Sequence, residues 1–531
     1  MASVLDATYE LFRRHGLTTM FGNPGSTELP MLKDYPSDFR YILGLQEAVA
    51  VGMADGYAQA TGRVAHVNLH TAPGVGNGVG AIFNAQANKS PLLVTAGQQA
   101  RHLITLNANL TNRDAVEVPK PFVKWSYEVP RAADTTAAIA QAIHWASLPP
   151  KGPAFVSIPM DDWARETDDQ AAQWVTQRST SARAVADNET LRQLASRIDA
   201  AQNPVLVAGP DVDASGGWHD AIALAEKAHL PVWAPPATGG NRLGFPESHR
   251  YFRGLLPPAI GPIGETLKGH DLIVVAGSSV FAYYPNIPGP ALPEGAELVQ
   301  ITSDPYEAAR AQIGDAIVAD VGLTLAALVE LVSPSRRPEP EPLPALPDPE
   351  DGDPLQPGAV FATLADVIGE GIVVLESPTS TPALRARMKI SRPGSYYFAA
   401  GGGLGFGLAA ALGVQLAEPN RKVVCVLGEG SAQYAITGLW TAAAYNLPVT
   451  FLVTRNDEYS ILKWFGALEQ VGGVPGMDLP KLECAKVAEA YGVPSERVDG
   501  LEALRTSLTD ALAADGPRLL EVGVVPGMAL F

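Results

Sequence analysis

The segment Val423–Asn456 constrains the fold more than any other part of this chain. It begins with an apolar run, VVCVL, that ends in Gly428-Glu429-Gly430. A helix-compatible stretch follows, and a second apolar run, VTFLV, then leads to Asn456. This order predicts two parallel strands joined by a crossover helix, which places Glu429 and Asn456 at the same edge of a sheet. Their oxygen atoms suit a hard cation such as Mg2+, which usually shares its ligands with a diphosphate. Taken alone, the pattern also fits an ordinary βαβ unit with a Glu and an Asn on its surface.

Strand-like apolar runs alternate with helix-compatible stretches along all 531 residues and form three blocks. Between the second and third blocks, residues 333–357 are rich in proline and acidic residues, which favours an extended linker. We therefore predict an α/β chain of three doubly wound parallel-sheet domains, with functional sites at the carboxyl ends of the strands. The predicted domains cover residues 1–180, 181–340 and 341–531.

Composition excludes several classes of function. A net charge of −18 argues against nucleic acid as a partner, because phosphate binding needs a basic surface. No run of about twenty apolar residues predicts a membrane span. The N-terminal segment lacks the short apolar core of a secretory signal. The two cysteines, Cys425 and Cys484, make a disulfide framework improbable and fit a reducing compartment. We expect a cytoplasmic protein.

Several motifs resemble the thiamin-diphosphate-dependent enzymes. In that family a GDG is followed by an Asn about one crossover helix later, and here Glu429 stands where Asp is usual. FGNPGSTELP, LQEAVAVGMADGYAQATG, NLHTAPGVGN and SPLLVTAGQQ in the first block resemble the benzoylformate decarboxylase branch of this superfamily, as does GSYYFAAGGGLGFGLAAALGVQLAEP in the third. The resemblance extends along nearly the whole chain. It implies pyrimidine-binding, central and diphosphate-binding domains, in that order.

Glu47 lies near the start of a helix-compatible run of small apolar residues. A carboxylate buried there would have a raised pKa and could hold a proton near neutrality. The alternative is a Glu in the first turn that complements the helix dipole. The resemblance places Glu47 beside N1' of the cofactor's aminopyrimidine, where it would promote the imino tautomer that deprotonates the thiazolium.

His70 ends a buried-looking strand before an expected turn at Ala72-Pro73-Gly74, and it can exchange protons near neutral pH. A histidine satisfied within the core is the alternative. Ser26 lies in a tight turn, where its hydroxyl could bind a substrate carboxylate or cap a helix beginning near Glu28. The resemblance favours the catalytic roles for His70 and Ser26.

The resemblance also implies the cofactor and metal contacts. Thiamin diphosphate would contact Glu47, Thr379, Ser380, Gly402, Gly403, Leu404, Gly428, Gly430, Ser431 and Tyr459. Mg2+ would be held by the side chains of Glu429 and Asn456 and by the backbone carbonyl of Glu458. Asp457 and Glu458 add negative charge near a diphosphate, so they need the metal or a basic neighbour, Arg455 or Lys463.

Four apolar residues are suggested as the lining of a substrate pocket that accepts a hydrophobic acyl group, although each could equally be a core residue. They are Leu110, Ile461, Phe465 and Met477.

Two positions depart from the branch. Tyr284 stands where benzoylformate decarboxylases have a second active-site histidine, and a tyrosine with a pKa near 10 is a poorer proton shuttle. Ile461 is bulkier than the branch residue, which would favour a shorter aliphatic substrate.

We therefore predict a decarboxylase that depends on thiamin diphosphate and Mg2+ and converts a 2-oxo acid to an aldehyde and CO2. Benzoylformate is the first candidate substrate, and Glu47, His70, Ser26 and Tyr284 are the expected catalytic residues. An aliphatic 2-oxo acid, aldehyde carboligation, or a catalytically silent cofactor-binding protein are the alternatives. The resemblance places the cofactor between the first block of one subunit and the third of another, in a homotetramer built as a dimer of dimers. We predict neither nicotinamide nor flavin binding, because no convincing dinucleotide fingerprint occurs.

Overall fold

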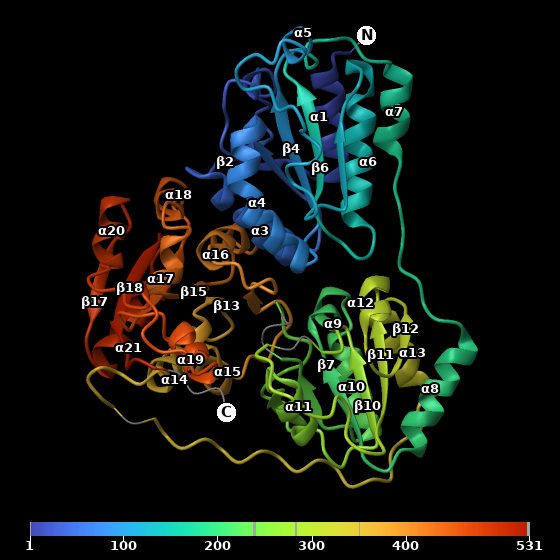
Figure 1. Ribbon diagram of the computed structural model, residues 1–531, viewed down its shortest axis with the longest axis vertical. Helices are drawn as coiled ribbons and strands as arrows, with labels where there is room; N and C mark the ends of the chain where they lie inside the picture. Colours follow the sequence, from blue (N-terminus) through green and yellow to red (C-terminus); the bar gives the residue numbers. More distant parts are fainter. Residues whose placement is uncertain (1, 237–240, 282–283, 350, 528–531) are drawn as a thin grey trace.

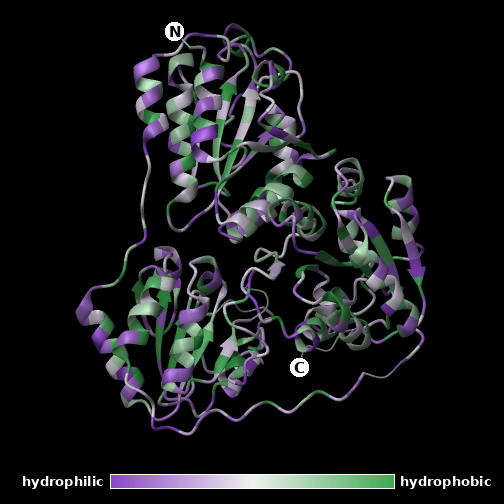
Figure 2. Ribbon diagram, turned by 180° about the vertical axis from the view of Figure 1, so that it is seen from behind, coloured by the Kyte–Doolittle hydropathy of each residue, from purple (hydrophilic) through white to green (hydrophobic). Residues whose placement is uncertain are grey.

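The computed structural model describes residues 2–236, 241–281, 284–349 and 351–527, which form three α/β domains (Figure 1). Each domain contains one six-stranded sheet whose neighbouring strands are all parallel. The predicted fold class is confirmed. Figure 2 shows that the strands are largely hydrophobic, as expected for parallel sheets covered by helices on both faces. Within the described ranges, the chain contains no helix with the length and hydropathy needed to cross a bilayer.

The first domain has the strand order β2-β1-β3-β4-β6-β5. The chain passes from β1 outward to β2 and then returns to the other side of β1 as β3. The carboxyl ends of β1 and β3 therefore flank a topological switch point, where open α/β sheets bind ligands. The strands are β1 (Thr19–Gly22), β2 (Arg40–Leu43), β3 (Ala65–Leu69), β4 (Leu92–Gln98), β5 (Trp125–Glu128) and β6 (Ala154–Pro159), and the helices are α1 (Val4–His15), α2 (Leu29–Leu32), α3 (Glu47–Thr61), α4 (Thr71–Ala87), α5 (Arg101–Ile104), η1 (Ala132–Asp134), α6 (Thr135–Ser147) and α7 (Asp169–Gln177).

The central domain has the order β12-β11-β10-β7-β8-β9, with its switch point between β7 and β10. The loops after these two strands are joined by a hydrogen bond from Asp211 N to the Gly277 carbonyl (3.1 Å). The strands are β7 (Pro204–Ala208), β8 (Val232–Ala234), β9 (Phe252–Leu255), β10 (Leu272–Ala276), β11 (Glu297–Thr302) and β12 (Asp315–Val318), and the helices are α8 (Asn188–Ala200), α9 (Pro210–Ala214), α10 (Trp218–Ala228), α11 (Ile260–Thr266), α12 (Pro305–Arg310) and α13 (Val321–Leu331).

The third domain has the order β14-β13-β15-β16-β18-β17, so its switch point lies between β13 and β15. The predicted GEG segment follows β15 directly. The strands are β13 (Ile372–Glu376), β14 (Tyr396–Phe398), β15 (Val423–Gly428), β16 (Val449–Arg455), β17 (Ser495–Val498) and β18 (Arg518–Gly523), and the helices are α14 (Pro357–Ile368), η3 (Pro378–Ser380), α15 (Thr381–Met388), α16 (Phe406–Ala417), α17 (Glu429–Gln433), α18 (Gly438–Ala444), α19 (Ser460–Leu468), α20 (Cys484–Ala490) and α21 (Leu501–Ala513).

Helices α3 and α16 join the first domain to the third (Figure 1). Their backbones approach so closely that a Cβ added at Gly56 would lie 2.2 Å from the Ala410 carbonyl oxygen. A Cβ at Gly413 would lie 1.9 Å from the carbonyl oxygen of Met53. Only glycine fits at these two positions, because any side chain would separate the helices.

The proline-rich segment between α13 and α14 runs along the outside of the molecule from the central to the third domain (Figure 1). Its described residues contain neither helix nor regular strand, apart from one β-bridge between Leu355 and Val524. The prediction of an extended linker is confirmed. The boundaries proposed at residues 180 and 340 both fall in segments without helix or strand, and they remain our division of the chain.

Candidate active site

Glu47 is the first residue of α3, and its side chain is buried in the first domain. Its carboxylate accepts hydrogen bonds from Asn23 Nδ2 (3.3 Å) and from Asn77 Nδ2 (3.1 Å) of α4. Gly74 lies opposite, where an added Cβ would stand 3.3 Å from the carboxylate oxygen. No basic side chain in the described part of the chain pairs with Glu47. The residue is therefore a buried acid held by two amides, at the edge of the sheet where β1 and β3 end.

His70 is the residue before α4 and lies at the end of β3. Its ring Nδ1 is 2.8 Å from Glu28 Oε2 and 3.2 Å from Thr27 Oγ1. Because a carboxylate only accepts hydrogen bonds, Nδ1 carries its hydrogen toward Glu28. This arrangement leaves Nε2 as the ring atom that can exchange a proton.

Glu28 is a functional residue that the sequence prediction missed. It is 1% exposed, and it accepts hydrogen bonds from the backbone N–H groups of Gly25 (2.9 Å) and Gly97 (2.9 Å) and from Thr27 Oγ1 (2.7 Å). These bonds fix the carboxylate that orients His70. The one signal in the sequence is that Glu28 and His70 follow two strands whose ends meet at the switch point.

Two local predictions in this region were wrong. The expected turn at Ala72-Pro73-Gly74 is the first turn of α4, where proline is tolerated because its missing N–H would have no intrahelical partner. Ser26 does not cap a helix: α2 begins at Leu29, and it has no side-chain cap. Ser26 is instead exposed in the turn after β1, so its hydroxyl is accessible to a ligand.

Leu110 is partly exposed and lies beside the same half of the site. Its backbone carbonyl accepts a hydrogen bond from Thr71 Oγ1 (3.1 Å). The loop that carries Leu110 therefore lies against the amino end of α4, next to His70. The first domain thus brings together Glu47, His70, Ser26 and Leu110 of the predicted site.

In the third domain, glycines line the edge of the sheet where β15 ends. A Cβ added at Gly430 would lie 2.6 Å from the ring of Tyr459. A Cβ at Gly428 would stand 3.6 Å from Ser431 Oγ and 3.9 Å from Ser377 Oγ. This small, hydroxyl-bearing cradle at the start of α17 fits the approach of a diphosphate to the backbone.

Glu429 is buried, and its carboxylate accepts a hydrogen bond from Asn456 N (3.1 Å). Burial raises the pKa of Glu429, and the negative charge of Asp457 adds to this shift. No ion pair of Glu429 with a basic side chain occurs among the described residues. A buried carboxylate without a counter-charge fits a site that takes up a cation.

The other two acids of this loop do have basic partners, as expected. Arg455 pairs with Asp457 (3.0 Å), and Lys463 forms an ion pair with Glu458 and another with Asp478 (2.6 Å). Glu429 is therefore the acid of this loop that lacks a basic partner among the described residues. The described residues contain no cluster of three His, Cys, Asp or Glu side chains arranged as metal ligands. The predicted set, one carboxylate, one amide and one backbone carbonyl, would need further ligands from a diphosphate.

The remaining cofactor residues lie on two neighbouring segments. Thr379 and Ser380 form η3, directly after β13, and α19 packs on η3. Gly402, Gly403 and Leu404 form the loop between β14 and α16, where Gly402 is exposed with a φ of +69° and Leu404 is partly exposed. At the far end of this loop, Glu376 accepts hydrogen bonds from the N–H groups of Gly405 (2.7 Å) and Phe406 (3.0 Å).

Three of the residues predicted to line the substrate pocket lie on or beside α19, where Tyr284 of the central domain contacts the third domain. The ring of Tyr284, from the central domain, is 60% exposed and lies 4.6 Å from the ring of Phe465 on α19. Ile461 is partly exposed on the same helix, and Met477 accepts a backbone hydrogen bond from Tyr459 (2.9 Å). These residues are therefore grouped around α19 and are not part of a closed core.

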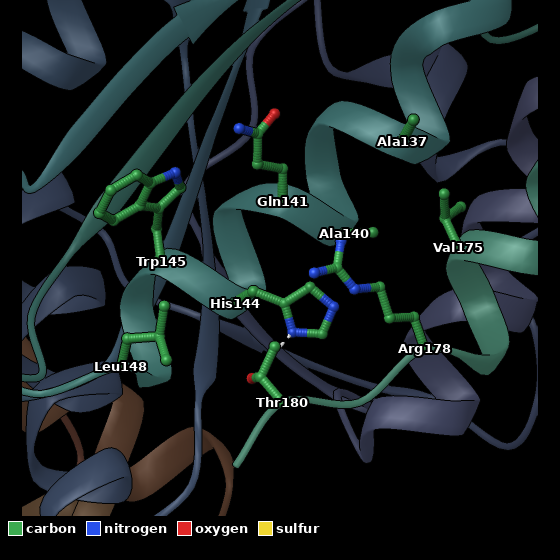
Figure 3. A pocket seen from close by; sticks show the side chains of 9 residues that line it. All are labelled: Ala137, Ala140, Gln141, His144, Trp145, Leu148, Val175, Arg178 and Thr180. Carbon is green, nitrogen blue, oxygen red and sulfur yellow. Dashed lines mark hydrogen bonds between the residues drawn. The ribbon is translucent and has the colours of Figure 1, made fainter. Parts of the chain in front are cut away.

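The two groups of predicted residues remain separate within one chain. The hydrogen bonds of Glu47 and His70 stay within the first domain, and those of Glu429 and Asn456 stay within the third. A cavity of about 430 Å3 opens elsewhere, between α6 and α7, and no predicted site residue lines it (Figure 3). Within one chain, the predicted site residues therefore form two separate groups, one in the first domain and one in the third.

We expect Glu429→Gln to stabilise the metal-free protein at neutral pH. A carboxyl whose pKa is raised by folding stabilises the protein below its unfolded pKa, and this contribution is lost as the pH rises through the folded pKa. Glutamine stays neutral and can still accept from Asn456 N–H. Thermal unfolding should show a higher Tm for the variant than for the wild type at neutral pH, and no gain in acid. Exposed Glu496→Gln is the control, and a less stable variant at neutral pH would contradict the prediction.

Comparison with known proteins matches this arrangement to one family. The N-terminal TPP-binding domain of thiamine pyrophosphate enzymes matches residues 2–118, their central domain matches 191–328, and their C-terminal TPP-binding domain matches 379–522. The chain is 50% identical over 525 residues to the benzoylformate decarboxylase of Pseudomonas aeruginosa, covering 98% of this chain and 99% of that protein.

Solved structures agree with these matches. The 4-hydroxybenzoylformate decarboxylase of Rhodococcus jostii RHA1 superposes with a TM-score of 0.97 at 45% identity, covering 99% of this chain and 100% of that one. The benzoylformate decarboxylase of Polynucleobacter necessarius superposes with a TM-score of 0.96 at 40% identity, covering 100% of both chains. On its sequence and its three domains, the chain belongs to the thiamin-diphosphate-dependent 2-oxo acid decarboxylase family.

Proposed function

We propose that this protein uses thiamin diphosphate and Mg2+ to decarboxylate an aryl 2-oxo acid, with benzoylformate as the first candidate substrate. The observation that carries the proposal is the His70–Glu28 pair at 2.8 Å beside the buried carboxylate of Glu47. In this proposal, the imidazole of His70 exchanges protons beside the buried acid Glu47, at the switch point between β1 and β3. The 50% identity to a benzoylformate decarboxylase supports the choice of substrate.

The residues of the chain divide the chemistry between them. When bound, thiamin diphosphate supplies the carbon nucleophile and accepts the electron pair that is released with CO2. Glu47 holds a proton beside the aminopyrimidine, and His70 Nε2 exchanges a proton with the reacting substrate. The hydroxyl of Ser26 orients the substrate carboxylate, and Tyr284 donates a hydrogen bond.

The third domain supplies the cofactor contacts in this proposal. Glu429, Asn456 and the backbone carbonyl of Glu458 would hold Mg2+, which would supply positive charge for the diphosphate. Thr379, Ser380, Ser431, Tyr459 and the three glycine positions Gly402, Gly403 and Gly428 would contact the cofactor, and Gly430 allows Tyr459 to approach. Leu404 would pack against the cofactor. Ile461, Phe465, Met477 and Leu110 line the acyl pocket.

We further propose that two subunits combine their half-sites. Large apolar side chains are exposed near both halves: Leu29 (60%), Leu45 (42%) and Leu106 (72%) near the first, and Tyr434 (57%), Leu462 (45%) and Val471 (53%) near the third. Contiguous exposed apolar patches mark protein–protein contacts, and we propose that these side chains belong to such a contact. A second copy that covers both sets would complete two active sites per dimer, and two dimers would form the proposed homotetramer. The two free, buried cysteines support a cytoplasmic location.

A shorter aliphatic 2-oxo acid is the second candidate substrate. Ile461 is partly exposed and lies four residues before Phe465 on α19, where its bulk would narrow the proposed pocket, and a narrower pocket favours a smaller acyl group. The same enzyme could then also join two aldehydes. The substrate experiment below includes both classes.

CO2 release should be measured with thiamin diphosphate and Mg2+ on benzoylformate, 4-hydroxybenzoylformate and pyruvate. We expect the aryl acids to be preferred, and Glu47→Gln to lower kcat by about 100-fold or more because the proton relay is lost. Glu10→Gln, on the exposed side of α1, is the matched control. Near-normal turnover by Glu47→Gln would refute the proposed role, and a preference for pyruvate would favour the second candidate.

Glu28→Gln should lower kcat by roughly 10- to 100-fold, because the carboxylate that accepts the hydrogen bond from His70 Nδ1 is lost. Steady-state CO2 release measures the change, and Glu10→Gln is again the control. If Glu28→Gln keeps the wild-type kcat, Glu28 does not act through His70.

Mixing two inactive variants tests the shared site. Glu47→Gln removes the first half-site and Glu429→Ala removes the third, so each variant alone should be inactive. In a mixed dimer one of the two sites has both halves intact, and random pairing should therefore restore roughly a quarter of the wild-type activity. No recovery, with mixed dimers shown to form, would mean that both halves serve the same chain.

A further inference from the structure

We propose that Asn84 of α4 is a positioning residue that sets the cofactor-binding loop of the third domain. Its side-chain amide forms two hydrogen bonds with one residue of that loop. Asn84 Nδ2 donates to the Gly403 carbonyl (2.8 Å), and Gly403 N donates to Asn84 Oδ1 (3.1 Å). The proposal rests on the cofactor contacts that we assign to Gly402, Gly403 and Leu404.

The contact between Asn84 and Gly403 depends on close packing at both residues. Asn84 is 3% exposed, so its amide would be left unsatisfied without Gly403. A Cβ added at Gly403 would lie 2.6 Å from Asn84 Oδ1, and one at Gly401 would lie 2.9 Å from the ring of Phe83. The loop therefore needs glycine at both positions in order to lie against α4.

A second amide of the same helix end supports the same loop. Asn88 Oδ1, one turn further on, accepts a hydrogen bond from Ala400 N (2.9 Å). Together with the bonds of Glu376 to Gly405 and Phe406, these contacts hold the loop at both ends. Between the two anchors, Gly402 is exposed and Leu404 is partly exposed, which leaves them free to meet a ligand.

Helix α4 also supports the other half-site. Asn77, which binds Glu47, is seven residues before Asn84, about two helical turns or roughly 10 Å along the helix. One helix therefore positions the acid of one half-site and the cofactor loop of the other. If two subunits share each site, as proposed above, these two halves belong to different active sites of the dimer. A displacement of α4 would then change the geometry of both active sites.

The test is the affinity of the metal-supplemented apoprotein for thiamin diphosphate, measured by calorimetry. We expect Asn84→Ala to raise the Kd about tenfold, because two hydrogen bonds to the loop are lost. At saturating cofactor, the KM for benzoylformate should stay within about twofold of the wild-type value, because the acyl pocket lies on other segments. The matched control is Gln86→Ala on the same helix, whose amide donates to the Pro121 carbonyl within the first domain.

Asn84→Asp keeps the acceptor for Gly403 N–H but places a carboxylate against the Gly403 carbonyl. Asn84→Asp should also raise the Kd for thiamin diphosphate. It replaces Asn84→Ala in the test if the alanine variant does not fold. A wild-type Kd in the variant that folds, or an equal rise in Gln86→Ala, would overturn the proposal. This test measures cofactor binding and does not depend on catalysis. If the wild-type protein released no CO2 from any acid tested, that result would overturn only the proposed function.

Discussion

The close crossing of α3 and α16 is the constraint on which the rest of the structure depends. Gly56 and Gly413 allow the two helix backbones to touch, and this contact fixes the first domain against the third. Glu47 begins one of these helices, and the glycine-rich cofactor loop leads into the other. The contact that joins the first domain to the third therefore also sets the position of two segments that carry proposed site residues.

The predicted site residues of one chain form two groups that lie in different domains. Glu47 and His70 make their hydrogen bonds in the first domain, and Glu429 and Asn456 make theirs in the third. Glu47 and Glu429 are both buried, and burial raises the pKa of Glu429. In the function proposed above, the cofactor and its metal ion would contact both carboxylates, one from each of two subunits.

Much of the fold was predictable because its signals are local. The apolar runs before Gly428 and before Asn456 are both central strands, and their polar ends meet at one edge as the parallel arrangement requires. The basic partners of Asp457 and Glu458 lie within a few residues, so they were also found. Glu28 and Asn84 were missed because their partners are 42 and 319 residues away. Such contacts depend on how the domains are placed, which no local pattern encodes.

The linker of residues 333–357 has a consequence for how the protein holds together. It joins the central and third domains along the outside, while non-covalent contacts fix the third domain to both of the others. Helix packing and the amides of Asn84 and Asn88 join it to the first domain, and the buried ion pair of Arg385 with Glu247 (2.6 Å) joins it to the central domain. The linker is therefore one of several connections that hold the third domain in place. A chain cut within the linker would keep its domains associated, and a gene split at that point could encode the same assembly as two polypeptides.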